Sequence, residues 1–244
     1  MKGGNMLRFL VAALIAAFAL LRGDGQAAEQ VTYATTPSAL QDYLCKPSGG
    51  GPFPLVVYNH GGLGTSIGGA PRQTCEALAG AGFVGLSPIR RQTRPMRGHI
   101  DDVFAALRYG LTLASVDRRR VALIGFSRGG LLTLIGAIQR DDLGAVVVMA
   151  TAIGRPEQMD RVKGDLGAIS APVLLMVAEN DTGSERTHGM NTLDGSRKIN
   201  KALIAAGRDV RYIEYPPFGS DGHALFFEVG DYWDDVLGFL RQHL

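Results

Sequence analysis

A serine stands between two glycines in the stretch VALIGFSRGGLLTL, residues 121–134. The apolar run before Ser127 is typical of a buried strand, and the apolar run after it is typical of a buried helix. A chain that turns from strand to helix within so few residues leaves little room for side chains, and Gly125 and Gly129 would provide that room. The pattern therefore predicts a nucleophile elbow that exposes Ser127 at its tip. The alternative is an ordinary serine in a glycine-rich turn.

A serine hydroxyl needs a base that takes its proton and an acid that orients the base. Around such an elbow the chain order is Ser, then Asp or Glu, then His. The apolar segment 172–178 leads into ENDTGS, and segment 209–215 leads into PPFGSDGHALFF. We therefore predict Asp181 as the acid and His223 as the base. Glu179 is the alternative acid, because it lies closer to the strand end.

The remaining histidines are less suited to the role of base. His60 precedes the serine in the chain, and His243 lies next to the C-terminus. We expect His99, at a helix start, and His188, in a polar loop, to be solvated surface residues. The histidines and the two cysteines lack the spacing of metal ligands, so we predict no metal and no cofactor.

Acyl transfer also needs hydrogen-bond donors for the oxyanion of the tetrahedral intermediate. One predicted donor is the backbone N–H of Arg128, directly after the serine. The second is the N–H of Gly62 in the HGG motif that follows the strand at 54–60, with Leu63 as the alternative. The glycine-rich loop that begins there has Ile67 where GxGxxG requires glycine, which excludes a dinucleotide fingerprint.

These residues must be positioned by a larger framework of alternating strands and helices. We expect strands at 31–36, 39–45, 54–60, 82–87, 121–126, 144–150, 172–178 and 209–215, and helices at 72–81, 99–115, 131–138, 195–206 and 228–242. Such alternation predicts an α/β fold: a mostly parallel central sheet with helices on both faces, in one domain over residues 28–244. The functional site of such a sheet lies at the carboxyl ends of its strands.

The first residues differ in character from the rest of the chain. Lys2 and Arg8 precede an apolar run of 13 residues at 9–21, and small residues follow up to Ala27. This pattern predicts a secretory signal peptide over residues 1–27, cleaved after Ala27. The alternative is an uncleaved N-terminal anchor. Export places the mature protein in the periplasm or outside the cell, with no stable membrane span.

Removal of that segment changes the charge balance. The whole chain carries a formal charge of +2, whereas residues 28–244 hold 22 basic and 22 acidic residues. The neutral balance argues against a nucleic-acid partner. Cys45 and Cys75 would both remain in an oxidising compartment, where they could form a disulfide or stay as two buried thiols.

With these residues in place, the chain resembles the dienelactone hydrolase family of α/β-hydrolases. The resemblance runs from LQDYLCKPSGGGPFPLVVYNHGG through GFSRGG to LLMVAENDTGS and SDGHALF. It implies an α/β-hydrolase fold, for which the short segment 151–171 leaves room for little or no cap. It also matches Ser127, Asp181 and His223 to the family's triad and Gly62 and Arg128 to its oxyanion donors. The chain departs from the family in having serine in place of the cysteine nucleophile, and in its signal peptide.

Together these features predict an exported serine hydrolase that cleaves a small or medium carboxylic ester, or a lactone, through an acyl-enzyme. Only 21 residues, 151–171, separate two strands where a cap would be inserted, so we expect an open site. A serine peptidase or amidase of the same fold is one alternative. A non-catalytic binding protein is another, but it would be expected to have lost part of the triad.

The expected partner is a small-molecule ester, and one further segment could contact it. Residues 88–97, PIRRQTRPMR, follow a strand on the same edge as Ser127. Arg90 or Arg91 could pair with a substrate carboxylate, and Arg94 and Arg97 extend the same cluster. The alternative is a solvated basic loop.

Overall fold

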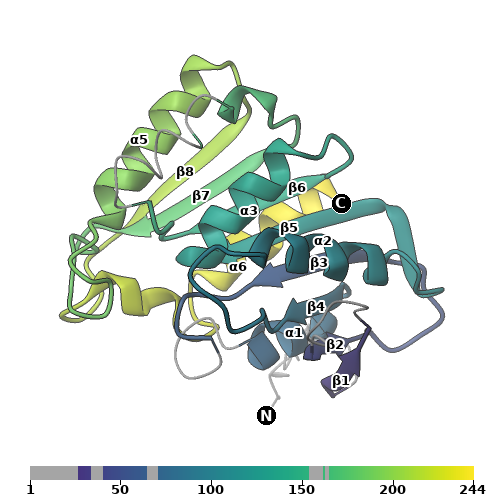
Figure 1. Ribbon diagram of the computed structural model, residues 1–244. Helices are drawn as coiled ribbons and strands as arrows, with labels where there is room; N and C mark the ends of the chain where they lie inside the picture. The colour runs from purple at the N-terminus through teal and green to yellow at the C-terminus, as the bar shows by residue number, and fades with distance from the viewer. Residues whose placement is uncertain (1–26, 34–40, 65–70, 154–161, 163–164) are drawn as a thin grey trace, which may run out of the picture.

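The computed structural model describes residues 27–33, 41–64, 71–153, 162 and 165–244, as an eight-stranded sheet covered by helices (Figure 1). The predicted α/β class, with a mostly parallel sheet, is confirmed. The predicted signal peptide lies outside the described residues except for Ala27, as does much of the segment 151–171. Within the described part of the chain, no helix is long and apolar enough to cross a membrane.

The strands follow one another across the sheet in a single fixed order. That order is β1 (Glu29–Thr32), β2 (Gln41–Cys45), β4 (Val84–Pro88), β3 (Phe53–Asn59), β5 (Val116–Phe126), β6 (Ala145–Met149), β7 (Val173–Ala178) and β8 (Val210–Tyr215). β2 runs antiparallel to both β1 and β4, and every pair from β4 to β8 is parallel. The carboxyl ends of six parallel strands therefore meet at one edge of the sheet.

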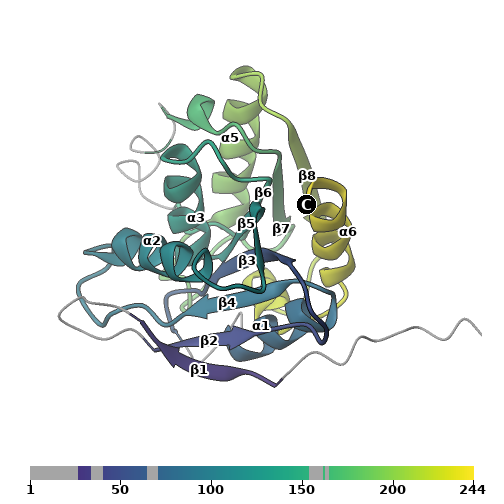
Figure 2. The ribbon, with the colours of Figure 1, turned by 90° about the vertical axis from the view of Figure 1, so that its right-hand side faces the viewer.

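Helices cover both faces of this sheet. Figure 2 shows α2 (His99–Gly110), α3 (Arg128–Ile138) and α5 (Thr192–Ala205) on one face, and α1 (Pro71–Gly80) and α6 (Trp233–His243) on the other. Successive residues of β5 point to opposite faces. Val121 and Leu123 accordingly pack in the core beneath α2 and α3, whereas Ala122 and Ile124 pack in the core beneath α6. Both faces bury apolar side chains, which is the usual state of a parallel sheet.

Some element boundaries differ from the sequence expectation. The helix expected at 99–115 ends at Gly110, and β5 begins at Val116 rather than at 121. The first half of β5 is polar and partly exposed, so it lacks the apolar pattern that marks the rest of the strand. The last helix begins at Trp233 rather than 228, because residues Gly222–Phe226 form a separate 3₁₀ turn before it.

The two cysteines are joined in a disulfide. Cys45 ends β2 and Cys75 lies in α1, with their Cα atoms 5.5 Å apart. Both side chains are fully buried. The alternative of two free thiols is therefore not what the structure shows, and the bond ties the antiparallel edge of the sheet to a helix on its face.

Candidate active site

Ser127 occupies a sharp turn between β5 and α3. Its backbone has φ 54° and ψ −116°, a region that non-glycine residues rarely adopt. A Cβ on Gly125 would lie 2.2 Å from the Gly129 carbonyl oxygen, and a Cβ on Gly129 would lie 1.8 Å from the Asn59 carbonyl oxygen. Both positions therefore require glycine, in keeping with the predicted elbow geometry.

Asp181 and His223 lie together beyond the ends of β7 and β8. The Asp181 Oδ2 is 2.7 Å from the His223 Nδ1 and also accepts a hydrogen bond from the Thr192 hydroxyl. Both side chains are buried, with exposed fractions of 0% for Asp181 and 6% for His223. Glu179, the alternative acid, is exposed and makes no side-chain hydrogen bond to a described residue. Of the two candidate acids, Asp181 is the one that contacts the imidazole.

The two loops that carry this pair are held against each other. The Asp221 side chain accepts a hydrogen bond from the His223 N–H, which begins the 3₁₀ turn. A Cβ on Gly222 would lie 2.6 Å from the Asp181 backbone nitrogen. Asn180 binds the Phe218 N–H through its side-chain oxygen. These contacts fix the distance between the acid and the imidazole.

A cavity of about 450 Å³ contains both Ser127 and His223. Its lining residues are Gly61, Gly62, Leu63, Pro95, Met96, Phe126, Ser127, Arg128, Leu131, Ala152, Arg186, Thr187, His188, Gly189, Met190, Thr192, His223 and Phe227. The Phe126 ring supports the His223 ring at a centroid distance of 4.7 Å. Because Asp181 occupies the His223 Nδ1, the Nε2 is the nitrogen left for the serine. The Ser127 hydroxyl makes no hydrogen bond to a described residue, so its relation to His223 rests on their shared cavity.

The two predicted oxyanion donors lie in the same cavity. Arg128 is the first residue of α3, where a backbone N–H has no partner within the helix. Gly62 follows β3, and a Cβ there would lie 3.1 Å from the Arg128 guanidinium. The Arg128 side chain therefore covers Gly62. Leu63, the alternative donor, also lines the cavity and is an exposed residue.

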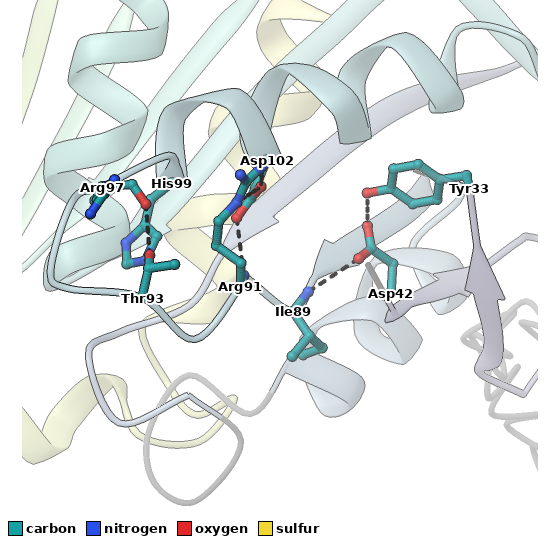
Figure 3. Close-up of polar contacts among 8 residues, drawn as sticks. All are labelled: Tyr33, Asp42, Ile89, Arg91, Thr93, Arg97, His99 and Asp102. Atoms are coloured by element: carbon teal, nitrogen blue, oxygen red, sulfur yellow. Dashed lines mark hydrogen bonds and ion pairs between the residues drawn. The ribbon is translucent and has the colours of Figure 1, made fainter. Parts of the chain in front are cut away.

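The structure corrects the expectation for Arg90 and Arg91, since neither residue lines the cavity. Arg90 is buried and donates hydrogen bonds to the carbonyl oxygens of His60 and Gly61. Arg91 forms an ion pair with the buried Asp102 of α2, as Figure 3 shows. Their partners come from other segments of the chain, so a charge cluster in the sequence could not identify them. The segment is a solvated basic loop only at Arg94 and Arg97, which are exposed.

The cavity contains cations that the sequence reasoning did not select. Arg128 is half-buried, and burial lowers the pKa of its guanidinium. It forms no ion pair with a described residue. Arg186 lies over the Phe227 ring, 5.5 Å from its centroid. The sequence places Arg128 directly after the serine, but the prediction used only its backbone N–H and not its guanidinium.

Two of the other histidines are buried, and for His99 this corrects the expectation of a surface residue. His99 packs beside Thr93 (Figure 3), and burial lowers the pKa of its imidazole. His60 is also buried, and burial together with nearby Arg90 lowers its pKa to about 3. His188 is exposed as expected, but it lies at the cavity rim. Within the described ranges, no group of His, Cys, Asp and Glu could hold a metal ion.

Comparisons with known proteins agree with this architecture. The model of the dienelactone hydrolase family matches residues 89–229. Over 255 residues, the chain is 24% identical to a "putative carboxymethylenebutenolidase" of Methylorubrum extorquens, covering 90% of this chain and 82% of the relative. It is also 27% identical to the "uncharacterized peptidase YtmA" of Bacillus subtilis, covering 71% of this chain and 80% of the relative.

Among solved structures, esterase B from Lactobacillus rhamnosis superposes with a TM-score of 0.69 at 18% identity. The superposition covers 91% of this chain and 86% of the esterase. At this level of identity the likeness concerns the fold, which is that of the α/β-hydrolases.

Proposed function

This chain belongs to the dienelactone hydrolase family of α/β-hydrolases, and on that basis we propose that it is a serine hydrolase of small or medium carboxylic esters. The observation that carries the proposal is the buried Asp181–His223 pair in the loops beside Ser127, with Ser127 and His223 lining one cavity. In this proposal Ser127 takes the place of the cysteine that the resemblance implies. A serine depends on the base for its activation, so the Asp181–His223 pair is essential.

The proposed reaction has two steps that use the same residues. His223 Nε2 takes the proton of the Ser127 hydroxyl as the serine oxygen attacks the ester carbonyl, and returns it to the leaving alcohol. Water then attacks the acyl carbon as His223 takes a proton from it; the bond between that carbon and the Ser127 oxygen breaks, His223 returns the proton to the serine, and the carboxylic acid leaves. Asp181 keeps the proton on the His223 Nδ1 and stabilises the imidazolium, while the N–H groups of Gly62 and Arg128 bind the oxyanion.

The charge of the cavity favours an anionic ester. Its described lining holds Arg128 and Arg186 and no carboxylate side chain. A half-buried guanidinium without an acid partner is well suited to a carboxylate on the substrate. The butyrate ester of 3-hydroxybenzoate carries such a carboxylate, and the butyrate ester of 3-hydroxybenzamide is its neutral counterpart. We expect Arg128→Leu to lower the ratio of their kcat/KM values, anionic over neutral, by about tenfold. An unchanged ratio would contradict the preference.

We further propose that the protein is exported, on the basis of the apolar segment at 9–21 and the small residues before Ala27. A buried disulfide between Cys45 and Cys75 agrees with an oxidising compartment. The N-terminal sequence of the protein recovered from the host's extracellular or periplasmic fraction tests this proposal. We expect it to begin at Ala28, whereas an intact Met1 in the cell fraction would contradict export.

Amide cleavage is the competing activity, because one relative is described as a peptidase. Matched p-nitrophenyl and p-nitroanilide substrates with a butyryl group separate the two. We expect turnover of the ester, its loss in Ser127→Ala, and its retention in Ser170→Ala, which changes an exposed serine remote from the cavity. Faster turnover of the anilide would favour the amidase, and no turnover of either would favour a binding protein.

A further inference from the structure

Arg90 is a buried cation that the proposed reaction does not use directly. Its exposed fraction is 6%, and it forms no ion pair with a described residue. Burial lowers its pKa to about 10, so the guanidinium remains charged at neutral pH. Burying a charge without an acid partner is unfavourable unless it is well hydrogen-bonded. The partners of Arg90 therefore indicate what the charge is for.

Those partners are two successive backbone carbonyls in the loop that follows β3 and carries Gly62, called the oxyanion loop below. Nη1 donates to the His60 oxygen at 2.7 Å, and Nη2 donates to the Gly61 oxygen at 2.8 Å. The planar guanidinium fork matches two such acceptors at once. Arg90 follows the end of β4, the strand next to β3, and from there it binds the segment that directly precedes Gly62.

The His60 side chain also hydrogen-bonds to the Gly61 carbonyl. Its Nε2 lies 3.4 Å from the Arg90 backbone N–H and serves as the acceptor. The proton of the neutral ring is then on Nδ1, which lies 2.8 Å from the Gly61 oxygen and donates to it. The Gly61 carbonyl therefore receives hydrogen bonds from the His60 and Arg90 side chains, and also a longer one, at 3.4 Å, from the Gly64 backbone N–H.

The orientation of that carbonyl determines the direction of the Gly62 N–H. In a planar trans peptide, the C=O of one residue and the N–H of the next point in opposite directions. Because the Gly61 oxygen is turned toward Arg90 and His60, the Gly62 N–H is turned away from them, toward the cavity that Gly62 lines. A cationic donor on the carbonyl also polarises the peptide and strengthens its N–H as a donor.

Arg90 is itself held in place from both sides. The preceding residue, Ile89, donates its N–H to Asp42 of β2. The following residue, Arg91, donates its N–H and its guanidinium to Asp102 of α2. Figure 3 shows these two anchors at either side of the segment. Arg90 is therefore positioned by two buried acids that belong to the framework rather than to the cavity.

We propose that Arg90 is a positioning residue of the oxyanion hole, which sets the Gly61–Gly62 peptide so that its N–H faces the ester oxygen. The proposal rests on the proposed function, since it assigns a role within that reaction. Arg90 acts through Gly62 and does not touch the substrate. Its effect is on the transition state, where the oxyanion forms, and not on binding of the ester in its ground state.

Matched lysine variants at neighbouring positions test the proposal. Arg90→Lys keeps a buried positive charge but lacks the fork that binds two carbonyls. We expect its kcat for p-nitrophenyl butyrate to fall by about tenfold, with KM within about threefold of wild type. Arg94→Lys, which changes an exposed arginine of the same segment that does not line the cavity and has no side-chain hydrogen bond to a described residue, is expected to keep kcat within about threefold. Arg90→Met, which removes the charge, is expected to lower kcat by about 100-fold.

A transition-state analogue supplies a readout that a loss of stability would not move. Butylboronic acid forms a tetrahedral adduct with an active serine, and its inhibition constant should rise by the same factor as kcat falls. The proposal is overturned if Arg90→Lys matches wild type or Arg94→Lys in kcat. It is also overturned if kcat falls while boronate affinity is unchanged. If the wild-type protein itself shows no turnover that depends on Ser127, the proposed function fails. If wild type is active and Arg90→Lys is unaffected, only the role of Arg90 fails.

Discussion

A single methyl group at Gly129 tests how the elbow and the oxyanion loop depend on each other. Gly129 lies in the first turn of α3, directly against the end of β3. A Cβ at this position would lie 1.8 Å from the Asn59 carbonyl oxygen and 2.6 Å from the His60 carbonyl oxygen. Gly129→Ala therefore forces the helix start away from the segment that leads to Gly62.

The size of the effect follows from these distances. An ordinary contact is about 3.4 Å, so the Gly129 and Asn59 backbones must separate by about 1.6 Å. Overpacking of this kind costs about 3 kcal/mol, and alanine returns about 1 kcal/mol through its helix propensity. The net loss of about 2 kcal/mol corresponds to a melting temperature lower by roughly 4–8 °C. A displacement of about 1 Å at the oxyanion loop should lower kcat/KM by about 100-fold.

Gly238 provides the matched control. It also lies inside a helix, α6, but a Cβ there would meet no heavy atom within 4 Å. Gly238→Ala should raise the free energy of unfolding by up to about 1 kcal/mol and leave ester hydrolysis unchanged. Thermal unfolding and p-nitrophenyl butyrate kinetics on both variants give the comparison. Wild-type stability and kcat/KM in Gly129→Ala would refute the proposed coupling.

Three further predictions concern the acid, a buried carboxyl and the disulfide. Asp181→Asn presents an amide to His223 and favours the wrong tautomer, so kcat should fall by about 10³–10⁴-fold while far-UV circular dichroism is retained; a loss below tenfold would contradict the assigned role. Burial raises the pKa of Asp42 to about 7, so the folded state favours the protonated carboxyl. The contribution of this group to the free energy of unfolding is therefore fully present below about pH 4 and is lost as the pH rises through 7. In urea unfolding, this group should lower the free energy of unfolding of the wild type by about 2–3 kcal/mol between pH 5 and pH 8, and Asp42→Asn should lack this decrease. The same pH dependence of the free energy of unfolding in both proteins would refute the prediction. The Cys45–Cys75 bond spans a sequence separation of 30, so its reduction should lower the free energy of unfolding of the wild type by about 3–4 kcal/mol. The variant with serine at both positions should not respond to dithiothreitol, and a wild type that does not respond either would contradict this prediction.

The local features of the site could be predicted from the sequence because each depends on neighbouring residues. The strand, the glycine pair and the helix around Ser127 are contiguous, and the loops that hold Asp181 and His223 follow apolar strands with clear ends. The chain order of such sites favours His223 as the base but is satisfied by both Glu179 and Asp181 as the acid. In the structure, Asp181 and His223 are in hydrogen-bond contact.

The features that escaped prediction depend on contacts between distant segments. Arg90 lies in a run of arginines that is typical of a solvated loop, but its partners lie 29 and 30 residues earlier in the chain. The polar start of β5 is a strand because it pairs with β3, not because of its own pattern. His99 differs, since its side chain contacts Thr93, only six residues earlier; the path of the loop between them buries the imidazole, and the local pattern does not reveal that path.

The most direct test of the account is to identify the residue that forms a covalent adduct with an active-site phosphonate. A fluorophosphonate reacts with a serine only when a base and an oxyanion hole activate it. We predict one adduct per chain by intact mass, located at Ser127 by peptide fragmentation, and slower formation of that adduct in His223→Ala. A protein that forms no adduct, or forms one at another residue, would contradict the central claim that Ser127 is the nucleophile.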